Sequence, residues 1–172
     1  MSLETKRIKE LFGYARTLTK EQGVGVMAGR AVGFFKRRFF GKKARYLPAK
    51  QTLDAQRADP VAKTWPTISI LTPLYNTPPQ FLQQFLNSVQ AQTAPNWQLV
   101  LVDASDDAHP DVGETVRTRA AQDKRIVYAK IENKGIAANT NEAAKLAAGE
   151  YLALADHDDM LAPHAVYCMS KA

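Results

Sequence analysis

The feature that most constrains the fold is a regular alternation of short apolar runs and helix-like segments, which begins at Thr67. Four short runs, rich in aliphatic and β-branched residues, are predicted as strands: 67–72, 98–102, 126–131 and 151–155. Three segments between them have the apolar spacing or composition of helices: 80–92, 111–122 and 136–148. Strands that alternate with helices form a parallel sheet covered on both faces. The sequence therefore predicts an α/β fold with a mainly parallel sheet and helices on both faces.

Two boundaries refine this prediction. Gly149 is expected to end the third helix, because glycine is favoured just after a helix. A last helix is predicted to start near Pro163 and to run to the end of the chain.

Charge divides the chain into two parts. Residues 1–50 contain 13 Lys and Arg but three Asp and Glu, a net charge of +10, whereas residues 51–172 contain 10 and 14, a net charge of −4. A proline-containing stretch, 46–66, is interpreted as a connector between them. We therefore predict a basic helical extension and linker over residues 1–65 and a separate α/β domain over residues 66–172.

Composition also narrows the class of protein. The single cysteine, Cys168, excludes a disulfide scaffold and a cysteine-based zinc site. No run of about 18 apolar residues is present, so no membrane-spanning helix is expected. The N-terminal residues lack the apolar core of a secretory signal, so we expect a cytoplasmic protein.

The basic part contains a segment, 30–43, that interleaves four phenylalanines with lysines and arginines. It is consistent with an amphipathic helix that lies on anionic lipid, which predicts peripheral contact with the inner face of the membrane. It is also consistent with a helical extension that packs its phenylalanines on the α/β domain. A nucleic-acid patch is the weakest interpretation, so no nucleic-acid partner is expected.

Ligands of parallel sheets bind outside the carboxyl ends of the strands, and polar residues follow each predicted strand. The last cluster is the most informative, because Asp156, Asp158 and Asp159 follow what is interpreted as a buried apolar strand. Three carboxylates within four residues repel one another unless a cation is present. Mg²⁺ and Mn²⁺ commonly combine one or two carboxylates with substrate phosphates. The alternative is a solvated loop that caps the next helix.

Several common sites are absent from the sequence. There is no G-x-x-x-x-G-K-[ST] phosphate loop and no G-x-G-x-x-G after the first strand. No G-x-S-x-G nucleophile elbow is present either. These absences argue against P-loop nucleotide hydrolysis, the usual dinucleotide cradle and α/β-hydrolase chemistry.

From about Pro66 onward, five motifs together resemble the N-terminal half of a glycosyltransferase family 2 domain. They are Ile68–Asn76 with its Pro-x-Tyr-Asn turn, the helix Leu86–Thr93, the strand Leu99–Asp103, the segment Asn133–Asn141, and Gly149–Asp159 with its D-x-D motif. The family often has a second acidic residue after Asp103, where this chain has Ala104. Asp-His-Asp-Asp followed by Pro163, His164 and Tyr167 is most similar to bacterial enzymes that build O-antigen and related surface polysaccharides.

This resemblance implies a Rossmann-like GT-A fold in truncated form, and a metal-dependent, inverting transfer of a sugar. The donor would be a nucleotide-diphospho-sugar, UDP- or dTDP-linked, and the acceptor a glycan or lipid-linked molecule in surface polysaccharide biosynthesis. Asp103 would hold the nucleobase through its N3–H, and Asp156 would contact the ribose or the metal shell. The residues implied to bind the nucleotide-sugar are Pro73, Tyr75, Asn76, Asp103, Asn141 and Asp156.

The same resemblance implies that Asp158, together with Asp156, ligates Mn²⁺ or Mg²⁺, which stabilises charge on the leaving diphosphate. Inversion needs a base that takes the acceptor's proton. In the family this base lies well after the D-x-D motif, so it is expected beyond residue 172 and no catalytic residue is named. The alternative is a truncated, non-catalytic nucleotide-binding or membrane-associated remnant of such an enzyme.

Overall fold

The structure is a computed structural model that describes residues 47–172. The predictions for segment 30–43 and the rest of the basic extension lie outside the described residues. Leu47–Ala172 forms one compact unit. The division between residues 1–65 and 66–172 stays a prediction.

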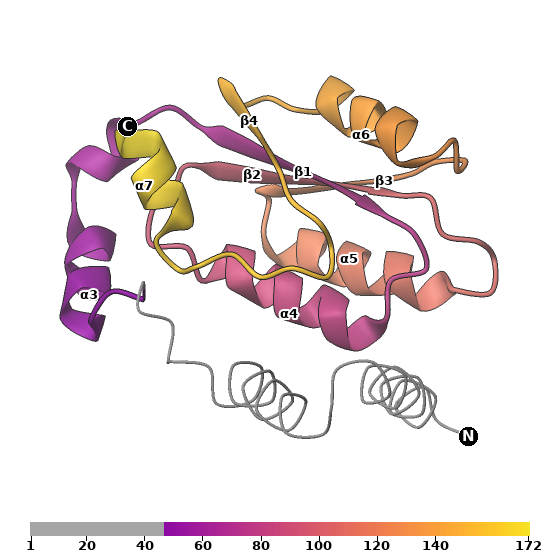
Figure 1. Cartoon of the computed structure of the whole chain (residues 1–172), viewed down its shortest axis with the longest axis horizontal. Helices are drawn as coiled ribbons and strands as arrows, with labels where there is room; N and C mark the ends of the chain where they lie inside the picture. Colours follow the sequence, from indigo (N-terminus) through magenta and orange to yellow (C-terminus); the bar gives the residue numbers. More distant parts are fainter. Residues whose placement is uncertain (1–46) are drawn as a thin grey trace, which may run out of the picture. The chain divides into compact units, whose positions relative to one another are not determined.

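Four parallel strands form the centre of the described unit, as the alternating pattern predicts (Figure 1). They are β1 (Ile68–Leu74), β2 (Trp97–Asp103), β3 (Ile126–Lys130) and β4 (Tyr151–Leu154). Their spatial order is β3-β2-β1-β4, and every neighbouring pair is parallel. The register pairs Leu74 with Asp103 and Asp103 with Lys130. The ends of β1, β2 and β3 therefore lie side by side at one edge of the sheet.

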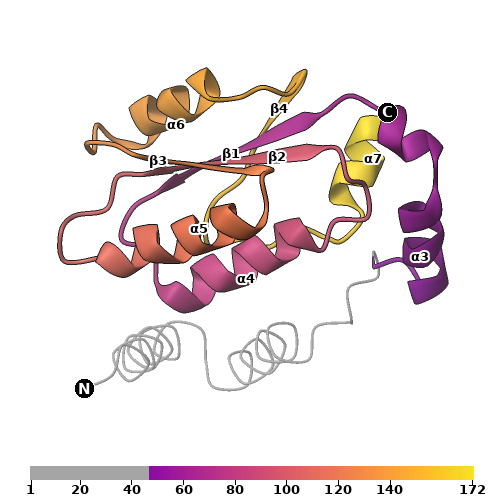
Figure 2. The ribbon, with the colours of Figure 1, turned by 180° about the vertical axis from the view of Figure 1, so that it is seen from behind.

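Helices cover both faces of this sheet, which confirms the predicted fold class. Helices α4 (Pro79–Gln90) and α5 (Pro110–Gln122) lie on one face, and α6 (Ile136–Lys145) lies on the other (Figures 1 and 2). The C-terminal helix α7 (Ala165–Lys171) adds Val166 to the core on the α4 side. Within residues 47–172, no helix combines the length and the apolar character needed to cross a membrane.

The core explains why the strand runs are so apolar. β1 and β2 occupy the middle of the sheet, and helices cover both of their faces. Nearly every residue of these two strands is therefore buried, on one face or the other. The larger cluster packs β1, β2 and β3 against α4 and α5, and its α4 residues are Leu82, Phe85, Leu86 and Val89. A smaller cluster on the other face includes Leu71, Val100, Val102 and Ala143.

Strand β4 differs from the sequence interpretation, which took it as a buried strand. Tyr151, Leu152 and Leu154 are 61%, 56% and 73% exposed. The reason is its position: β4 pairs with β1 on one side only and is an edge of the described sheet, and α6 packs over β1 and β2 instead. An apolar run does not distinguish a central strand from an edge strand.

Gly149 also has a different role from the one predicted. Helix α6 ends at Lys145 with Leu146 as its C-cap, so Gly149 does not end it. A Cβ atom at Gly149 would lie 2.6 Å from the Thr67 carbonyl oxygen and 2.8 Å from the Ser69 nitrogen. The glycine is therefore needed because the chain passes very close to β1 as it enters β4.

Before β1, the stretch interpreted as a connector contains α3 (Lys50–Ala58) and a short 3₁₀ helix, η1 (Val61–Thr64). It is tied to the α/β unit by side chains. The Tyr167 hydroxyl donates to Asp59 at 2.8 Å, and the Asn96 amide donates to the Trp65 carbonyl at 2.5 Å. These hydrogen bonds hold the stretch against the α/β unit. The proline content did not predict this, because the partners lie far away in the sequence.

Candidate functional site

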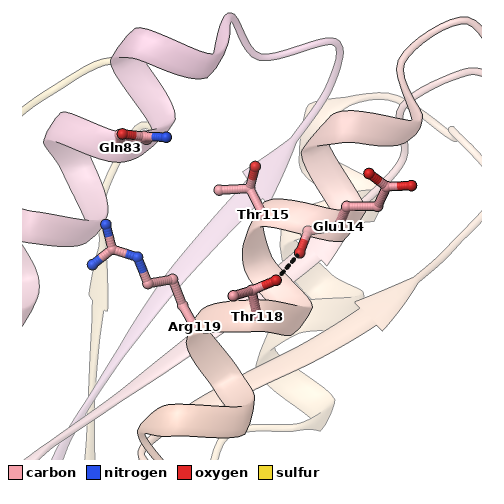
Figure 3. Close-up of a pocket in the computed structure, with 5 residues that line it drawn as sticks. All are labelled: Gln83, Glu114, Thr115, Thr118 and Arg119. Atoms are coloured by element: carbon pink, nitrogen blue, oxygen red, sulfur yellow. Dashed lines mark hydrogen bonds between the residues drawn. The ribbon is translucent and has the colours of Figure 1, made fainter.

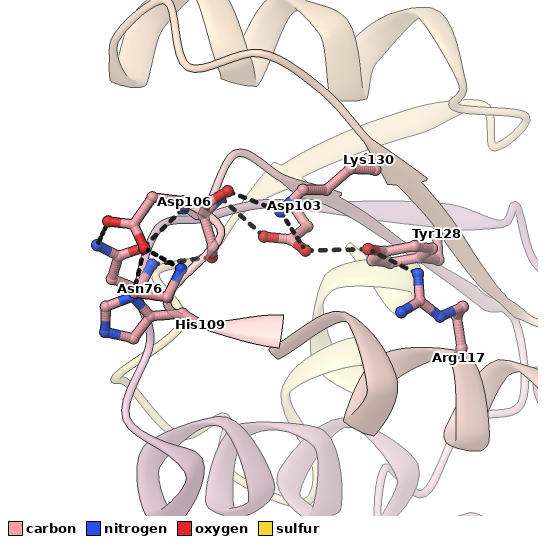
Figure 4. Close-up of polar contacts among 9 residues, drawn as sticks. Asn76, Asp103, Asp106, His109, Arg117, Tyr128 and Lys130 are labelled. Atoms are coloured by element: carbon pink, nitrogen blue, oxygen red, sulfur yellow. Dashed lines mark hydrogen bonds and ion pairs between the residues drawn. The ribbon is translucent and has the colours of Figure 1, made fainter. Parts of the chain in front are cut away.

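The loops that follow β1 and β2 are joined by a reciprocal pair of side chains (Figure 4). The Asn76 amide nitrogen donates to Asp106 Oδ2 at 2.8 Å, and the Asp106 backbone N–H donates to Asn76 Oδ1 at 3.1 Å. The Asn76 backbone N–H donates to Ser105 Oγ at 2.9 Å. Asn76 has a φ of 48°, a left-handed conformation that asparagine tolerates better than most residues. The two loops therefore form one unit at the edge where the carboxyl ends of β1 and β2 lie.

His109 completes this unit. Its Nδ1 lies 2.6 Å from Asp106 Oδ1. The hydrogen bond from His109, followed by that from Asn76, lowers the pKa of Asp106 below its ordinary value. His109 was not a predicted site residue, because a lone histidine three residues after an aspartate gives no distinctive pattern.

Asp103 lies at the centre of a second network and is only 1% exposed. Its Oδ1 accepts the Ser105 backbone N–H at 2.9 Å, and its Oδ2 accepts the Tyr128 hydroxyl at 2.9 Å and Lys130 Nζ at 3.2 Å. Lys130 also donates to the Ser105 carbonyl at 2.7 Å. Asp103 thus connects β2 to β3 and fixes the start of the loop that carries Ser105.

The ionisation of this network follows from its contacts. Burial opposes the charge on Asp103, but hydrogen bonds from Ser105, Tyr128 and Lys130 outweigh it, so the pKa of Asp103 is lowered. Burial, together with the hydrogen bond to Asp103, raises the pKa of Tyr128 to about 12. Arg117 Nη1 lies 3.5 Å from the Tyr128 hydroxyl. At neutral pH Asp103 is therefore a carboxylate and Tyr128 a neutral phenol.

Gly113 makes room for this network. A Cβ atom at this position of α5 would lie 2.5 Å from the Tyr128 hydroxyl and 3.2 Å from Asp103 Oδ2. Any larger residue would push the phenol away from the carboxylate. A glycine in the first turn of α5 therefore makes room for the contact between Asp103 and β3.

At the end of β4, the three predicted carboxylates are exposed. The Asp159 backbone N–H donates to the Asp156 carbonyl at 3.2 Å, which closes a turn around Asp158. None of the ion pairs found in residues 47–172 involves these three carboxylates. No group of three metal-ligating side chains is close enough to hold an ion by itself within this part of the chain. A pair of free carboxylates nevertheless fits Mg²⁺ or Mn²⁺, which complete their shells with phosphate and water oxygens.

The acidic turn continues into a segment that is held against the end of α4. The Leu161 backbone N–H donates to Ser88 Oγ at 3.1 Å. Gln92 holds the same segment from two sides: its Nε2 donates to the Ala162 carbonyl at 2.8 Å, and its Oε1 accepts the Val166 N–H at 2.9 Å. Sequence reasoning missed Ser88 and Gln92 as site residues. The only signal in the sequence was that Ser88 and Gln92 are polar residues on the apolar side of the predicted helix 80–92.

The remaining predicted residues lie in three different elements. Pro73 lies in β1 and is partly buried beside Val102, its partner in the register. Tyr75 is 49% exposed in the loop after β1. Asn141 is exposed on α6. The structure therefore joins Asn76 to the loop that follows Asp103, but it does not bring Asn141 into either network.

A shallow hollow between α4 and α5 lies apart from these networks (Figure 3). It is lined by Gln83, Glu114, Thr115, Thr118 and Arg119. The Thr118 hydroxyl donates to the Glu114 carbonyl at 2.9 Å. None of the predicted site residues lines this hollow.

Comparison with known proteins supports the resemblance found in the sequence. The uncharacterized protein y4gI of Sinorhizobium fredii is 43% identical over 102 residues, which cover 59% of this chain and 11% of the relative. The O-antigen biosynthesis protein RfbC of Myxococcus xanthus is 32% identical over 120 residues, 69% of this chain and 9% of RfbC. The chain thus spans about a tenth of the length of these relatives.

Among solved structures, S. aureus TarS 1–349 in complex with UDP-GlcNAc matches with a TM-score of 0.52 and 24% identity. The match covers 61% of this chain and 30% of that one, and it confirms the GT-A type of fold. The family model described as "Glycosyl transferase family 2" matches residues 69–171, which is more than half of the chain. This chain belongs to glycosyl transferase family 2.

Proposed function

We propose that the described unit binds a nucleotide-diphospho-sugar, UDP- or dTDP-linked, and serves a metal-dependent, inverting glycosyltransferase. The observation that carries the proposal is the placement of two different polar sites along one edge of the sheet. Asn76, Asp103 and Lys130 lie at the ends of β1, β2 and β3, and the free carboxylates follow β4. A nucleoside diphosphate needs both a pocket for its nucleoside and a cation for its phosphates.

The dimensions of the sheet support this assignment. Neighbouring strands are about 4.8 Å apart, so the three steps from β3 to β4 span about 14 Å. An extended nucleoside diphosphate is of similar length. The nucleoside would lie over the ends of β1, β2 and β3, and the diphosphate would lie at the acidic turn after β4.

At the acidic turn, Asp156 and Asp158 would hold Mn²⁺ or Mg²⁺. When bound, the ion would stabilise the negative charge that develops on the leaving diphosphate. Ser88 and Gln92 would position the turn by holding the segment that follows it. The similarity to RfbC, an O-antigen biosynthesis protein, supports a role in surface polysaccharide biosynthesis. The acceptor would be a glycan or a lipid-linked molecule, at the inner face of the membrane.

The test is calorimetric titration of UDP with and without Mn²⁺. We expect Mn²⁺ to strengthen UDP binding to the full chain, and Asp158→Ala to abolish that strengthening. Glu114→Ala is the matched control, because Glu114 is an exposed carboxylate on α5 outside the predicted site. UDP binding that depends on Mn²⁺ equally in both variants would show that the metal lies elsewhere. Assay of sugar transfer by the same protein would then separate an enzyme from a binding remnant.

A further inference from the structure

We propose that the segment before β1, residues 50–65 (the brace), holds the acidic turn after β4 in the position in which it binds the metal. This inference rests on the proposed function and deepens it. It makes Gln56, Asp59 and Trp65 positioning residues, although all three precede residues 69–171, the range that matches the family model. Loss of the brace should weaken the contribution of Mn²⁺ to donor binding and leave the binding of the nucleoside unchanged.

The acidic turn, residues 156–159, is held through its two ends, and its carboxylates are exposed. β4 holds the first end, where the Ala155 N–H donates to the Leu71 carbonyl at 3.2 Å. The second end continues into the segment 161–166. The position of the carboxylates therefore depends on what holds this segment as well as on β4.

Two successive residues at the end of α4 hold the segment 161–166. Gln92 does so through its side chain. Thr93 does so through its backbone, since its N–H donates to the Pro163 carbonyl at 2.8 Å. The Thr93 hydroxyl donates to Gln56 Oε1 in α3 at 2.9 Å, and Thr93 is only 4% exposed. Thr93 therefore joins the brace to the segment that follows the acidic turn.

The brace also contacts α7, which continues the same segment. η1 lies beside α7 (Figures 1 and 2). The Tyr167 hydroxyl donates to Asp59 Oδ2 at 2.8 Å, and Asp59 Oδ1 accepts the Val61 N–H at 3.0 Å, which fixes the carboxylate. The ring of Trp65 packs edge-on against that of Tyr167, with 4.9 Å between their centroids. The brace is therefore joined at two points to the chain that follows the acidic turn.

The consequence for metal binding follows from populations. Two carboxylates share one cation only when both are in place. The apparent affinity for the metal therefore falls with the fraction of molecules whose turn has this geometry. Each hydrogen bond lost from the brace shifts that equilibrium by about fivefold. Coupling of this kind is reciprocal, so metal binding should also stabilise the brace.

The first test compares the UDP affinity of full-chain variants with and without Mn²⁺, by calorimetric titration. In Gln56→Ala/Asp59→Ala, which removes both side-chain contacts, the strengthening of UDP binding by Mn²⁺ should fall about threefold or more. The affinity without Mn²⁺ should stay the same, a split that a general loss of structure does not produce. Gln51→Ala/Asp54→Ala removes the same two residue types from exposed positions of α3, and this matched control should keep the wild-type values.

The second test measures the reciprocal effect in the unchanged protein by native-state hydrogen exchange. The amides of Asp59 and Val61 are hydrogen-bonded within the brace. Mn²⁺ with UDP should slow their exchange about threefold or more relative to UDP alone. The Arg125 amide, which donates to Asp123 before β3, is the control and should keep its rate. Since this test needs no variant, it stays decisive even where the double variant fails to fold.

The outcomes separate this inference from the proposed function. Equal Mn²⁺ dependence in the two double variants, or brace amides whose exchange Mn²⁺ does not slow, would overturn the inference and leave the donor site intact. An equal loss of UDP affinity with and without Mn²⁺ would also overturn it, because the brace would then serve the fold alone. A wild-type protein whose UDP binding does not respond to Mn²⁺ would refute the proposed function, and the inference with it.

Discussion

Replacing Gln92 with alanine is expected to release the segment that carries the acidic turn from α4. Gln92 is 8% exposed, and its side chain makes three hydrogen bonds. Two reach the segment after β4, at Ala162 and Val166, and one is local, to the Ser88 carbonyl at 3.0 Å. Alanine keeps the backbone conformation but supplies none of these contacts.

The magnitude follows from the number of contacts that are lost. A hydrogen bond of this kind contributes about 1 kcal/mol net, and a buried group that loses its partner costs about 1–3 kcal/mol. The Val166 N–H is such a group, because Val166 is fully buried. Three lost bonds therefore amount to about 3 kcal/mol in the free energy of unfolding, which corresponds to about a hundredfold change in the opening equilibrium.

Two measurements check this prediction. Urea denaturation should show the fall in the free energy of unfolding, and native-state hydrogen exchange should show faster exchange of the Leu161 and Val166 amides. Gln84→Ala is the control, because Gln84 is exposed on α4 and its loss should change the free energy by less than about 0.5 kcal/mol. Similar values for the two variants would refute the reasoning that Gln92 holds this segment.

Three further predictions concern other contacts. Gly149→Ala places a Cβ atom 2.6 Å from the Thr67 carbonyl oxygen and should lower the free energy of unfolding by about 1–3 kcal/mol, as measured with urea. Because the folded-state pKa of Tyr128 is raised from 10.0 to about 12, the stability it contributes should be full below pH 10 and lost as pH rises toward 12. Tyr128→Phe keeps the ring but not the hydrogen bond to Asp103, so its stability should not show this loss between pH 10 and pH 12. Urea denaturation of both proteins at these two pH values measures the difference. Asn76→Ala forces alanine into a left-handed conformation and removes two side-chain hydrogen bonds, so we expect a loss of about 2 kcal/mol and weaker UDP binding in the same titration as above.

The local pattern of the sequence was sufficient for the order of the elements. Strands β1 and β2 are buried on both faces, so burial leaves a continuous apolar run that a single sequence shows directly. Helix α4 is amphipathic because one side packs on the sheet. The positions of Asp103 and of the acidic turn after β4 followed as well, since polar residues at strand ends are a local feature.

The tertiary structure decided everything that depends on which strands are neighbours. The order β3-β2-β1-β4 places Lys130 and Tyr128 beside Asp103, 27 and 25 residues away in the sequence. It also leaves β4 at an edge, which its apolar composition did not reveal. Gln92 became a support for the acidic turn only because α4 lies next to a segment 70 residues later.

The physical reason for this division is the range of the interactions. Propensity, periodicity and strand-end chemistry act over a few residues, so the sequence determined the fold class, the family resemblance and the edge of the sheet where polar residues gather. A hydrogen bond between distant residues depends on the order of the strands and on the packing of the helices. The local pattern of a single sequence predicts neither of these. Which group supports each carboxylate was therefore settled by the three-dimensional arrangement alone.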